Sequence, residues 1–206
     1  MVLIFQRKYI MKEISNKMIK SDLANYIYNI DNLRNLVRYQ TAPRVSQETV
    51  AEHSFFVAAY VLKLNDYYEF DLLKALQTAI LHDFSEVFIS DVPHPIKKAF
   101  PLINDELNKA ENEVNKKFIS EEFSNNLEEF NNLSSPEGIM VALGDILSVV
   151  SYSKYEITLG NSKYMKDVLM KTTERYLDVI KKAEPYLKKG MSSQMIVNFI
   201  ENFKNK

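Results

Sequence analysis

The chain contains no cysteine among its 206 residues. Disulfide bonds, zinc–thiolate sites and thiol nucleophiles are therefore excluded, and cysteine usage says nothing about the cellular compartment. Glycine and proline are also scarce, with 4 and 6 residues. An all-β fold needs tight turns at short intervals, and these two residue types supply many of them. The composition therefore favours an all-α fold, and the 46% hydrophobic content is enough for one domain with one core.

The chain also lacks a charge excess and any long apolar segment. Its 26 basic and 27 acidic residues give a formal net charge of -1, so no global field attracts nucleic acid or an anionic membrane. No stretch approaches the roughly 20 apolar residues of a membrane span, and the apolar start is too short for a signal peptide. We expect a soluble, cytoplasmic protein that binds no nucleic acid and no membrane. Residues 1–20 are expected to form a partly disordered extension, with Met11 as an alternative start, and residues 21–206 the domain.

Apolar residues recur at helical spacing along most of the chain. This periodicity predicts helices over residues 22–37, 49–67, 71–82, 105–118 and 135–159, and then two further helices divided at Gly190. Thr49 and Glu52 form a capping-box pattern for the second of these helices. The segment DVPHP at 91–95 is predicted to be a loop because of its two prolines. The acidic, Asn-rich segment 120–138 is predicted to be a mobile connection, either a loop or a short helix.

The three histidines, His53, His82 and His94, all lie in the first half of the chain. Apolar residues follow His53 at spacings of four, four and three, which places its ring on the core-facing side of a helix. His82 shares a stripe with apolar residues of its own helix, so His82 and Asp83 close a helix whose apolar face is buried. Asp145 lies at the centre of the apolar run IMVALGDILSVV. These positions predict two buried imidazoles and two buried carboxylates.

A single histidine on an apolar face is more often a hydrogen-bonded core residue than a ligand. Here two histidines accompany two acids, and an uncompensated buried carboxylate costs several kcal/mol. A cation removes that cost. Two imidazoles and two carboxylates suit one divalent first-row transition metal, with positions left for water and substrate. We therefore predict that His53, His82, Asp83 and Asp145 bind one such ion, which is Co, Mn, Ni, Fe or Zn.

The order of these residues resembles the HD-domain superfamily, in which a distant His, a His-Asp doublet and a later Asp surround a metal. The chain is more closely similar to the bacterial 5'-deoxynucleotidase branch in four places: Arg38, VAEHS at 50–54, LHDFSEVFISDVPHPIK at 81–97 and GDILSVVSYSKYEITLGN at 144–161. This resemblance implies a single-domain, HD-type helical bundle with the metal site between core helices. It also implies removal of the 5'-phosphate from (deoxy)ribonucleoside monophosphates by a metal-associated water.

The resemblance assigns roles to residues near the ligands. Glu86 follows His82 by four residues, so on a continuing helix it shares that face and serves as general acid or base; the alternative is a solvated carboxylate. Arg38 is expected to clamp the phosphate, although arginines at helix ends are usually only solvated. Asp83 is expected both to bind metal and to steer the attacking water. Tyr39 contacts substrate where similar proteins have Trp, so the choice between ribose and deoxyribose stays open.

The loop after Glu86 is expected to bind the sugar. Asp91 matches a substrate-binding position, although a turn-initiating Asp before proline is the alternative. The full set of expected substrate-binding residues is Arg38, Tyr39, His53, Asp83, Asp91, Val92, Pro93, His94 and Asp145. Lys97 adds positive charge near the phosphate. Glu156 either orients a ligand or Arg38, or lies on the surface.

Other functions remain open at this stage. The chain could act on another phosphate ester, such as a triphosphate, cyclic nucleotide or alarmone, or be a metal-stabilised nucleotide-binding module without turnover. An HD-type oxygenase with two iron ions needs more histidines than His94 provides. Apolar stripes within residues 165–206 are expected to complete the bundle and to form a homodimer.

Overall fold

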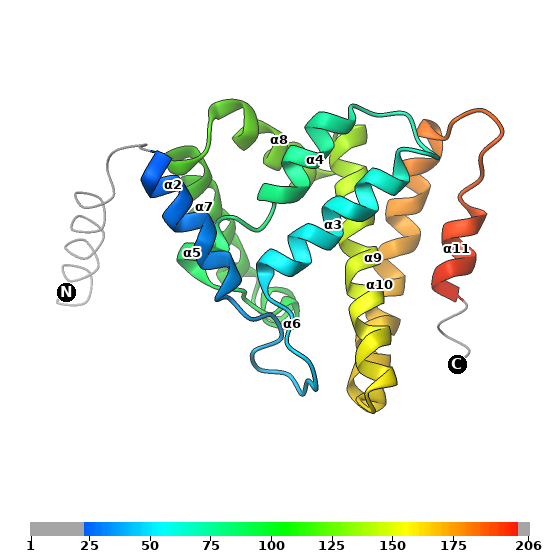
Figure 1. The fold of residues 1–206 in the computed structure, drawn as a ribbon, viewed down its shortest axis with the longest axis horizontal. Helices are drawn as coiled ribbons and strands as arrows, with labels where there is room; N and C mark the ends of the chain where they lie inside the picture. Colours follow the sequence, from blue (N-terminus) through cyan, green and yellow to red (C-terminus); the bar gives the residue numbers. More distant parts are fainter. Residues whose placement is uncertain (1–22, 202–206) are drawn as a thin grey trace.

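The computed structural model describes residues 23–201, and these are organised as helices with no β-strand among them. Four helices form the centre of the molecule (Figure 1): α3 (Val50–Leu64), α4 (Leu72–Leu81), α9 (Pro136–Thr158) and α10 (Ser162–Ala183). α9 packs against each of the other three, and α3 also packs against α4. The predicted all-α fold is confirmed, and α9 is its central element.

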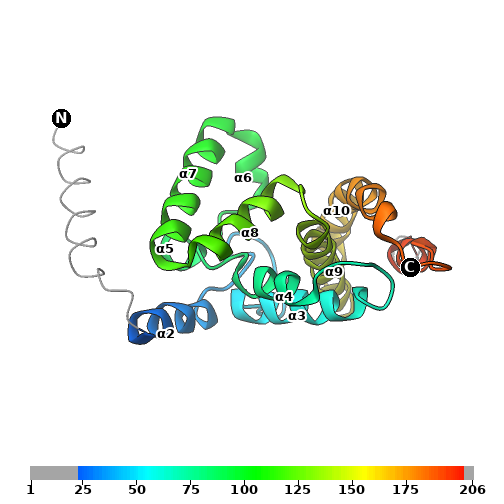
Figure 2. The ribbon, with the colours of Figure 1, turned by 90° about the horizontal axis from the view of Figure 1, so that it is seen from above.

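The remaining helices surround this centre. They are α2 (Leu23–Asp31), η1 (Asn32–Arg34), α5 (Glu86–Ile89), α6 (His94–Ala99), α7 (Pro101–Phe118), α8 (Glu121–Asn132), η2 (Glu184–Tyr186) and α11 (Gln194–Glu201). Seen from above, α5, α6 and α7 lie on one side of α9, and α10 and α11 lie on the other (Figure 2). The central helix is therefore covered from both sides.

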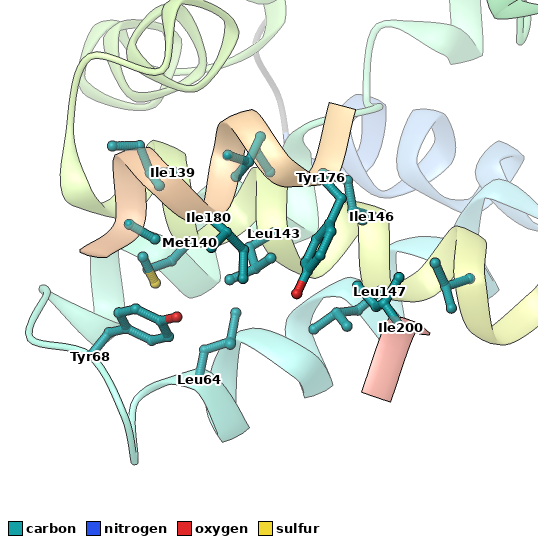
Figure 3. Packing of buried hydrophobic residues seen from close by; sticks show 14 of the residues in the cluster. Leu64, Tyr68, Ile139, Met140, Leu143, Ile146, Leu147, Tyr176, Ile180 and Ile200 are labelled. Atoms are coloured by element: carbon teal, nitrogen blue, oxygen red, sulfur yellow. The ribbon is translucent and has the colours of Figure 1, made fainter. Parts of the chain in front are cut away.

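The main hydrophobic core surrounds α9 (Figure 3). The run from Ile139 to Leu143 is buried on every face, which explains why this segment shows little amphipathic periodicity. From α10, the core receives Tyr176, Val179 and Ile180, each at most 4% exposed. The prediction that the C-terminal stripes complete the bundle is thus confirmed, because these side chains are used within the chain.

The first helix is shorter than predicted. α2 ends at Asp31 and continues as one turn of 3-10 helix, after which the chain becomes extended and Val37 forms an isolated antiparallel bridge with Thr49. The bridge draws the chain away from the helical path that the apolar spacing suggested. Thr49 also caps α3 with the predicted capping box. Both ends of the intervening loop, residues 39–48, therefore lie beside the start of α3.

Two neighbouring helices, α6 and α7, carry a proline in their first turn, and α6 begins inside the segment 91–95 that was predicted to be a loop. α6 starts at His94 and carries Pro95 in its first turn, and α7 starts at Pro101 instead of residue 105. Proline is tolerated there because the first N–H groups of a helix have no intrahelical partner. In the segment 120–138 the short-helix alternative is the one observed, since the Ser120 hydroxyl caps α8 by accepting the Phe123 N–H.

The expectations for residues 1–20 lie outside the described part of the chain. Within residues 23–201, no single helix is long and apolar enough to cross a membrane; α8 and α9 reach that length and composition only as a pair, bent by 66°.

Gly138 marks a close approach between α9 and α8. A Cβ added there would lie 2.8 Å from the Phe130 Cα and 2.9 Å from the Glu129 carbonyl oxygen. We expect Gly138→Ala to lower the free energy of unfolding by about 1–3 kcal/mol through overpacking, which outweighs the helix-propensity gain of about 1 kcal/mol. Urea unfolding followed by circular dichroism measures this. An unchanged or higher midpoint would show that the two helices can separate at little cost.

Candidate metal centre

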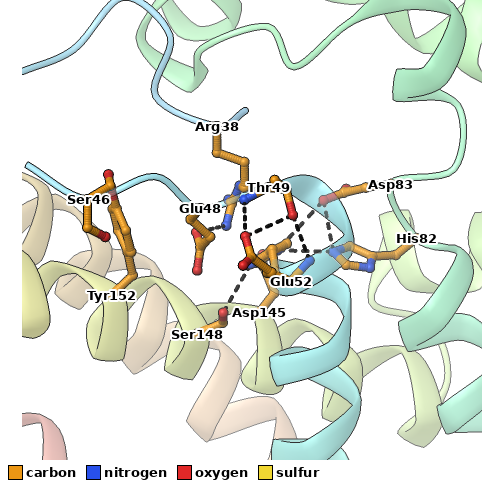
Figure 4. A network of polar contacts seen from close by, with 11 residues as sticks. Arg38, Ser46, Glu48, Thr49, Glu52, His82, Asp83, Asp145, Ser148 and Tyr152 are labelled. Atoms are coloured by element: carbon orange, nitrogen blue, oxygen red, sulfur yellow. Dashed lines mark hydrogen bonds and ion pairs between the residues drawn. The ribbon is translucent and has the colours of Figure 1, made fainter. Parts of the chain in front are cut away.

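Three helices bring the four predicted ligands to one place, and Figure 4 shows three of them, His82, Asp83 and Asp145. His53 lies in the first turns of α3 and is 1% exposed. His82 is the C-cap residue of α4, Asp83 follows it in the turn, and Asp145 projects from the middle of α9. The packing of α3 against both α4 and α9 therefore creates the site.

The ligand atoms converge within a few ångströms. His82 Nε2 lies 3.3 Å from His53 Nε2 and 3.2 Å from Asp83 Oδ2. His53 Nε2 lies 3.6 Å from Asp83 Oδ2 and 3.3 Å from Asp145 Oδ1. Ligands about 2.1 Å from a common ion are separated by roughly 3.0–3.4 Å, so these spacings suit one metal ion. His53, His82 and Asp83 form a group whose ligand atoms all lie within 4.8 Å of one another, and Asp145 joins it through its contact with His53.

Hydrogen bonds to the far side of each imidazole orient the rings. His82 Nδ1 lies 2.8 Å from the Ala79 carbonyl oxygen, which can only accept, so Nδ1 carries the proton. His53 Nδ1 lies 3.0 Å from the Ser148 hydroxyl, which can accept a hydrogen bond from Nδ1 or donate one to it. When both rings are neutral with the proton on Nδ1, the two Nε2 lone pairs face each other across 3.3 Å. A cation between them turns this repulsion into attraction, and the same outward hydrogen bonds are typical of metal-binding histidines. Burial lowers the pKa of His82, but Asp83 raises it more, so a proton on His82 Nε2 is the other way to relieve this repulsion.

The charge states favour a cation as well. Burial and the nearby Arg38 charge lower the pKa of His53 to about 4, which keeps its ring neutral. Burial raises the pKa of Asp83, but the nearby His82 lowers it by more than burial raises it. The pKa of Asp83 therefore lies below its usual range. The pKa of Asp145 is also lowered, because its contacts with His53 and Arg175 outweigh burial. Two ionised carboxylates and a neutral imidazole thus surround the position that a divalent ion would take.

Arg175 of α10 is a partner of this site that the sequence did not predict. Its Nη1 lies 3.0 Å from Asp145 Oδ2, and its side chain is half exposed. The expectation that Asp145 would be uncompensated without a metal was therefore wrong, because a protein cation already contacts its outer oxygen. No sequence pattern indicates this contact, because Arg175 lies 30 residues after Asp145. It is also one of many charged residues at exposed positions of α10.

Arg38 lies at the base of the 39–48 loop and is held there by Glu48. Arg38 Nη1 is 3.0 Å from Glu48 Oε2, and the Arg38 backbone N–H donates to the Glu48 carbonyl at 2.9 Å. Burial lowers the pKa of Arg38, but Tyr39 and the acidic residues Glu48, Asp83 and Asp145 raise it, so the guanidinium stays charged. The charges of Asp83 and Asp145 thus act on Arg38, and its expected contact with the phosphate stays a prediction. Glu48 was not predicted, because a single Glu in a polar loop carries no signal.

Glu86 lies near the ligands, but by a different route from the one predicted. The helix does not continue beyond His82; a turn intervenes, and Glu86 begins the four-residue helix α5. Glu86 Oε2 is buried without a hydrogen-bond partner in the described structure. Burial, with the charges of Asp83 and Asp91, raises the pKa of Glu86 to about 10. The surroundings of Glu86 thus favour its protonated form.

Asp91 connects its loop to the residue after Arg38. Its carboxylate accepts a hydrogen bond from the Tyr39 backbone N–H, and burial raises its pKa. Tyr39 has a φ of 56° and stacks on Tyr152 of α9, with ring centroids 5.0 Å apart. Asp91 is therefore more than a turn-initiating residue. The structure brings the Arg38-Tyr39 pair and Asp91 together, although they are separated by about 50 residues.

The other predicted substrate residues have fewer defining contacts. Val92 and Pro93 are partly buried between α5 and α6. The side chain of His94 lies outside the described part of the structure, so its expected role stays a prediction. Lys97, expected near the phosphate, forms an ion pair with Glu111 of α7 at 3.1 Å.

Comparisons with known proteins define the class of fold and then the family. An HD-domain phosphohydrolase from Listeria innocua superposes with a TM-score of 0.57 at 21% identity, covering 88% of this chain and 99% of that one. A Pyrococcus horikoshii protein superposes with a TM-score of 0.65 at 25% identity, covering 89% and 99%. The fold is thus that of the HD-domain phosphohydrolases. Residues 25–192 match the model of the 5'-deoxynucleotidase YfbR-like family, and the chain belongs to this family.

Curated relatives agree with this assignment. A 5'-deoxynucleotidase of Vibrio vulnificus is 30% identical over 155 residues, covering 68% of this chain and 79% of that protein. A 5'-deoxynucleotidase of Pasteurella multocida is 27% identical over 168 residues, covering 73% and 86%. The predicted membership of the 5'-deoxynucleotidase branch is confirmed, and the chain is an HD-domain phosphohydrolase.

Proposed function

We propose that this enzyme removes the 5'-phosphate from deoxyribonucleoside monophosphates, and from ribonucleoside monophosphates to the extent that the sugar site admits them. The observation that carries this proposal is the pair of imidazole Nε2 atoms 3.3 Å apart beside Asp83 and Asp145, in a member of the 5'-deoxynucleotidase YfbR-like family. The 5'-deoxynucleotidase relatives indicate the class of substrate. The two imidazoles and two carboxylates are suited to bind the metal ion that the hydrolysis needs.

His53, His82, Asp83 and Asp145 would hold one divalent transition metal, which is Co, Mn, Ni, Fe or Zn. When bound, such an ion acts as a Lewis acid on a phosphate oxygen and makes water a better nucleophile. The Ser148 hydroxyl and the Ala79 carbonyl keep the two imidazoles oriented for this task. Asp83 has a second role, because an ionised carboxylate beside the phosphate can accept a proton from the attacking water.

Arg38 binds the phosphate. A guanidinium has five N–H donors in a planar fork, and the bond to Glu48 engages one end of it. The rest of the fork remains for a bidentate contact with two phosphate oxygens, near the acidic residues that raise the pKa of Arg38. The bond to Glu48 thereby holds the guanidinium at the base of the loop.

Glu86 supplies the proton for the leaving 5'-oxygen. Its carboxyl keeps a proton at neutral pH, because burial and the neighbouring acids raise its pKa to about 10. The leaving nucleoside alkoxide needs such a proton as the phosphorus–oxygen bond breaks. On the nucleoside side, we assign Tyr39, Asp91, Val92, Pro93 and His94 to contacts with sugar and base.

The experiment is a substrate panel. Phosphate release is measured with deoxyribo- and ribonucleoside 5'-monophosphates, 3'-monophosphates, triphosphates, cyclic nucleotides and an alarmone, each with added Co, Mn or Zn. We expect hydrolysis of the 5'-monophosphates only. A preference for any other ester would place the enzyme among the other HD hydrolases, and metal binding with no hydrolysis of any compound would identify a binding module.

Arg38→Lys tests the phosphate contact separately. Lysine keeps the positive charge but loses the planar fork, so one of two parallel hydrogen bonds to phosphate is lost. We expect kcat/KM to fall by about 10- to 100-fold, in line with the loss of a charged hydrogen bond. Steady-state kinetics measure this, and Arg34→Lys, at an exposed arginine of η1, is the control. Equal activity of the two variants would remove Arg38 from the site.

The homodimer and the cytoplasmic location remain expectations. Side chains of α10 that were expected to contribute to a dimer are used in the core of the chain itself. Light scattering coupled to size-exclusion chromatography gives the mass in solution, and a mass near 24.0 kDa would rule the dimer out.

A further inference from the structure

Glu156 is a buried carboxylate that the proposed chemistry leaves unused. It lies near the end of α9, is 0% exposed, and accepts hydrogen bonds from the 39–48 loop. Its Oε2 accepts the Val45 backbone N–H at 2.8 Å, and its Oε1 accepts the Ser46 backbone N–H at 2.6 Å. A buried carboxylate must be fully hydrogen-bonded to be tolerated, and here the partners are loop amides more than 100 residues away in sequence.

Asn161 completes this arrangement just beyond the end of α9. Its Nδ2 donates to Glu156 Oε2 at 2.8 Å and to the Pro43 carbonyl at 2.8 Å. One side-chain amide therefore bridges the carboxylate and a third point of the loop. Together, Glu156 and Asn161 bind Pro43, Val45 and Ser46 through three hydrogen bonds, and a fourth joins the two side chains to each other. We call these two residues the loop clamp.

The loop clamp is linked to Tyr39 through Tyr152. The Tyr152 hydroxyl donates to the Ser46 carbonyl at 2.9 Å, and its ring stacks on Tyr39 at an interplanar angle of 14° (Figure 4 shows Tyr152 beside Ser46). Arg44 adds a bond from Nη1 to the Tyr39 carbonyl at 2.7 Å. The Tyr39 ring is thus held by Tyr152, which is itself bonded to the part of the loop that the clamp binds.

Arg38 has an attachment of its own, although its guanidinium also lies over the Tyr39 ring, 5.5 Å from the ring centroid. It is held at the base of the loop by the ion pair and the backbone bond to Glu48, and by the bridge between Val37 and Thr49. The loop therefore has two separate attachments. The one at its base positions the phosphate-binding arginine, and the one at its far end positions the aromatic ring next to it.

We infer that Glu156 and Asn161 are positioning residues for nucleoside recognition, which set the affinity for the sugar and base by fixing the 39–48 loop and the Tyr39 ring. This inference rests on the proposed function. It assigns the clamp no part in the chemical step, because it touches neither the metal ligands nor Glu86. Loosening it should therefore weaken binding of the nucleoside while leaving phosphate binding and turnover in place.

Two variants of the loop clamp test this. Glu156→Gln places an amide NH₂ against a loop N–H and removes the charge, whereas Asn161→Ala removes the bridge and leaves the carboxylate, which makes it the milder change. Glu128→Gln, at an exposed position of α8, is the matched control. We expect KM for a deoxyribonucleoside 5'-monophosphate to rise about tenfold in Glu156→Gln and less in Asn161→Ala, with kcat within about threefold of the parent. Inhibition by inorganic phosphate should be unchanged.

Hydrogen–deuterium exchange supplies a readout without substrate. The amides of Val45 and Ser46 should exchange faster in both clamp variants than in the parent, while the α3 amides keep their protection. Unchanged exchange of these two amides, or faster exchange with unchanged KM, would overturn the inference. A parent enzyme without activity would refute the proposed function instead; nucleotide affinity by calorimetry then replaces KM, and equal affinities of parent and variants would overturn the clamp.

Discussion

Asp83→Ala is expected to reduce phosphate release by at least about 10³-fold, even with excess divalent metal. The Asp83 carboxylate lies 3.2 Å from His82 Nε2 and 3.6 Å from His53 Nε2, so it is close to both imidazoles, and we propose it as a ligand. Loss of this carboxylate weakens the binding of a metal ion that supplies several kcal/mol of charge stabilisation in the transition state. Each 1.4 kcal/mol corresponds to about tenfold in rate.

The measurement is single-turnover phosphate release, together with the metal content per chain. Circular dichroism establishes that the variant folds. Asp66→Ala is the control, because Asp66 is an exposed acid in the turn after α3 whose ion-pair partner is Lys63. If Asp83→Ala retained full activity with metal added, the assignment of this site would be wrong.

Glu86→Gln is expected to lower kcat by about 10² to 10⁴-fold, the usual contribution of a general acid. Glutamine keeps the size and polarity of the side chain but has no proton to transfer to the leaving oxygen. Pre-steady-state kinetics with the 5'-monophosphate measure the step directly. A substrate with a better leaving group should recover much of the lost rate, because it needs less protonation. Equal losses with both substrates would contradict the role of Glu86 as the acid.

The same variant should be more stable than the parent in EDTA at neutral pH. The pKa of Glu86 is raised from 4.5 in the unfolded chain to about 10 in the folded one. Between these values the unfolded state releases the proton and the folded state keeps it, so the stability of the parent falls as the pH rises. Glutamine removes this dependence. These two pKa values imply a difference of about 4 kcal/mol at pH 7.5, which shrinks towards pH 5. A difference in unfolding free energy that does not vary with pH would show that Glu86 ionises normally.

The convergence of the four proposed ligands was predictable because a buried acid or imidazole within an apolar helical stripe is costly without a partner. His53 precedes Val57 and Val61 at helical spacing, and both are 0% exposed. Asp145 lies in the apolar run of α9. For these residues, local periodicity and polarity together indicate which face is buried, and hence that His53, His82, Asp83 and Asp145 point toward one another.

The residues that hold the substrate-binding residues in place were not predictable in the same way. Glu48, Arg175 and Asn161 act through contacts between segments that are distant in sequence, and each lies in a polar stretch where a charged or amide side chain is ordinary. Glu156 was left open between an orienting role and the surface; it proves to be fully buried and bonded to a loop. Such tertiary contacts produce no periodic pattern in the sequence. The end of α4 at His82, which sets the position of Glu86, produces none either.

The most direct test is phosphate release from 2'-deoxyadenosine 5'-monophosphate by EDTA-treated enzyme, titrated with one divalent metal at a time. Four ligands grouped around one position predict that activity is absent at the start, rises in proportion to added metal and reaches a plateau at one ion per chain. Activity that persists in EDTA, or a plateau at two ions per chain, would contradict the single-metal site of His53, His82, Asp83 and Asp145.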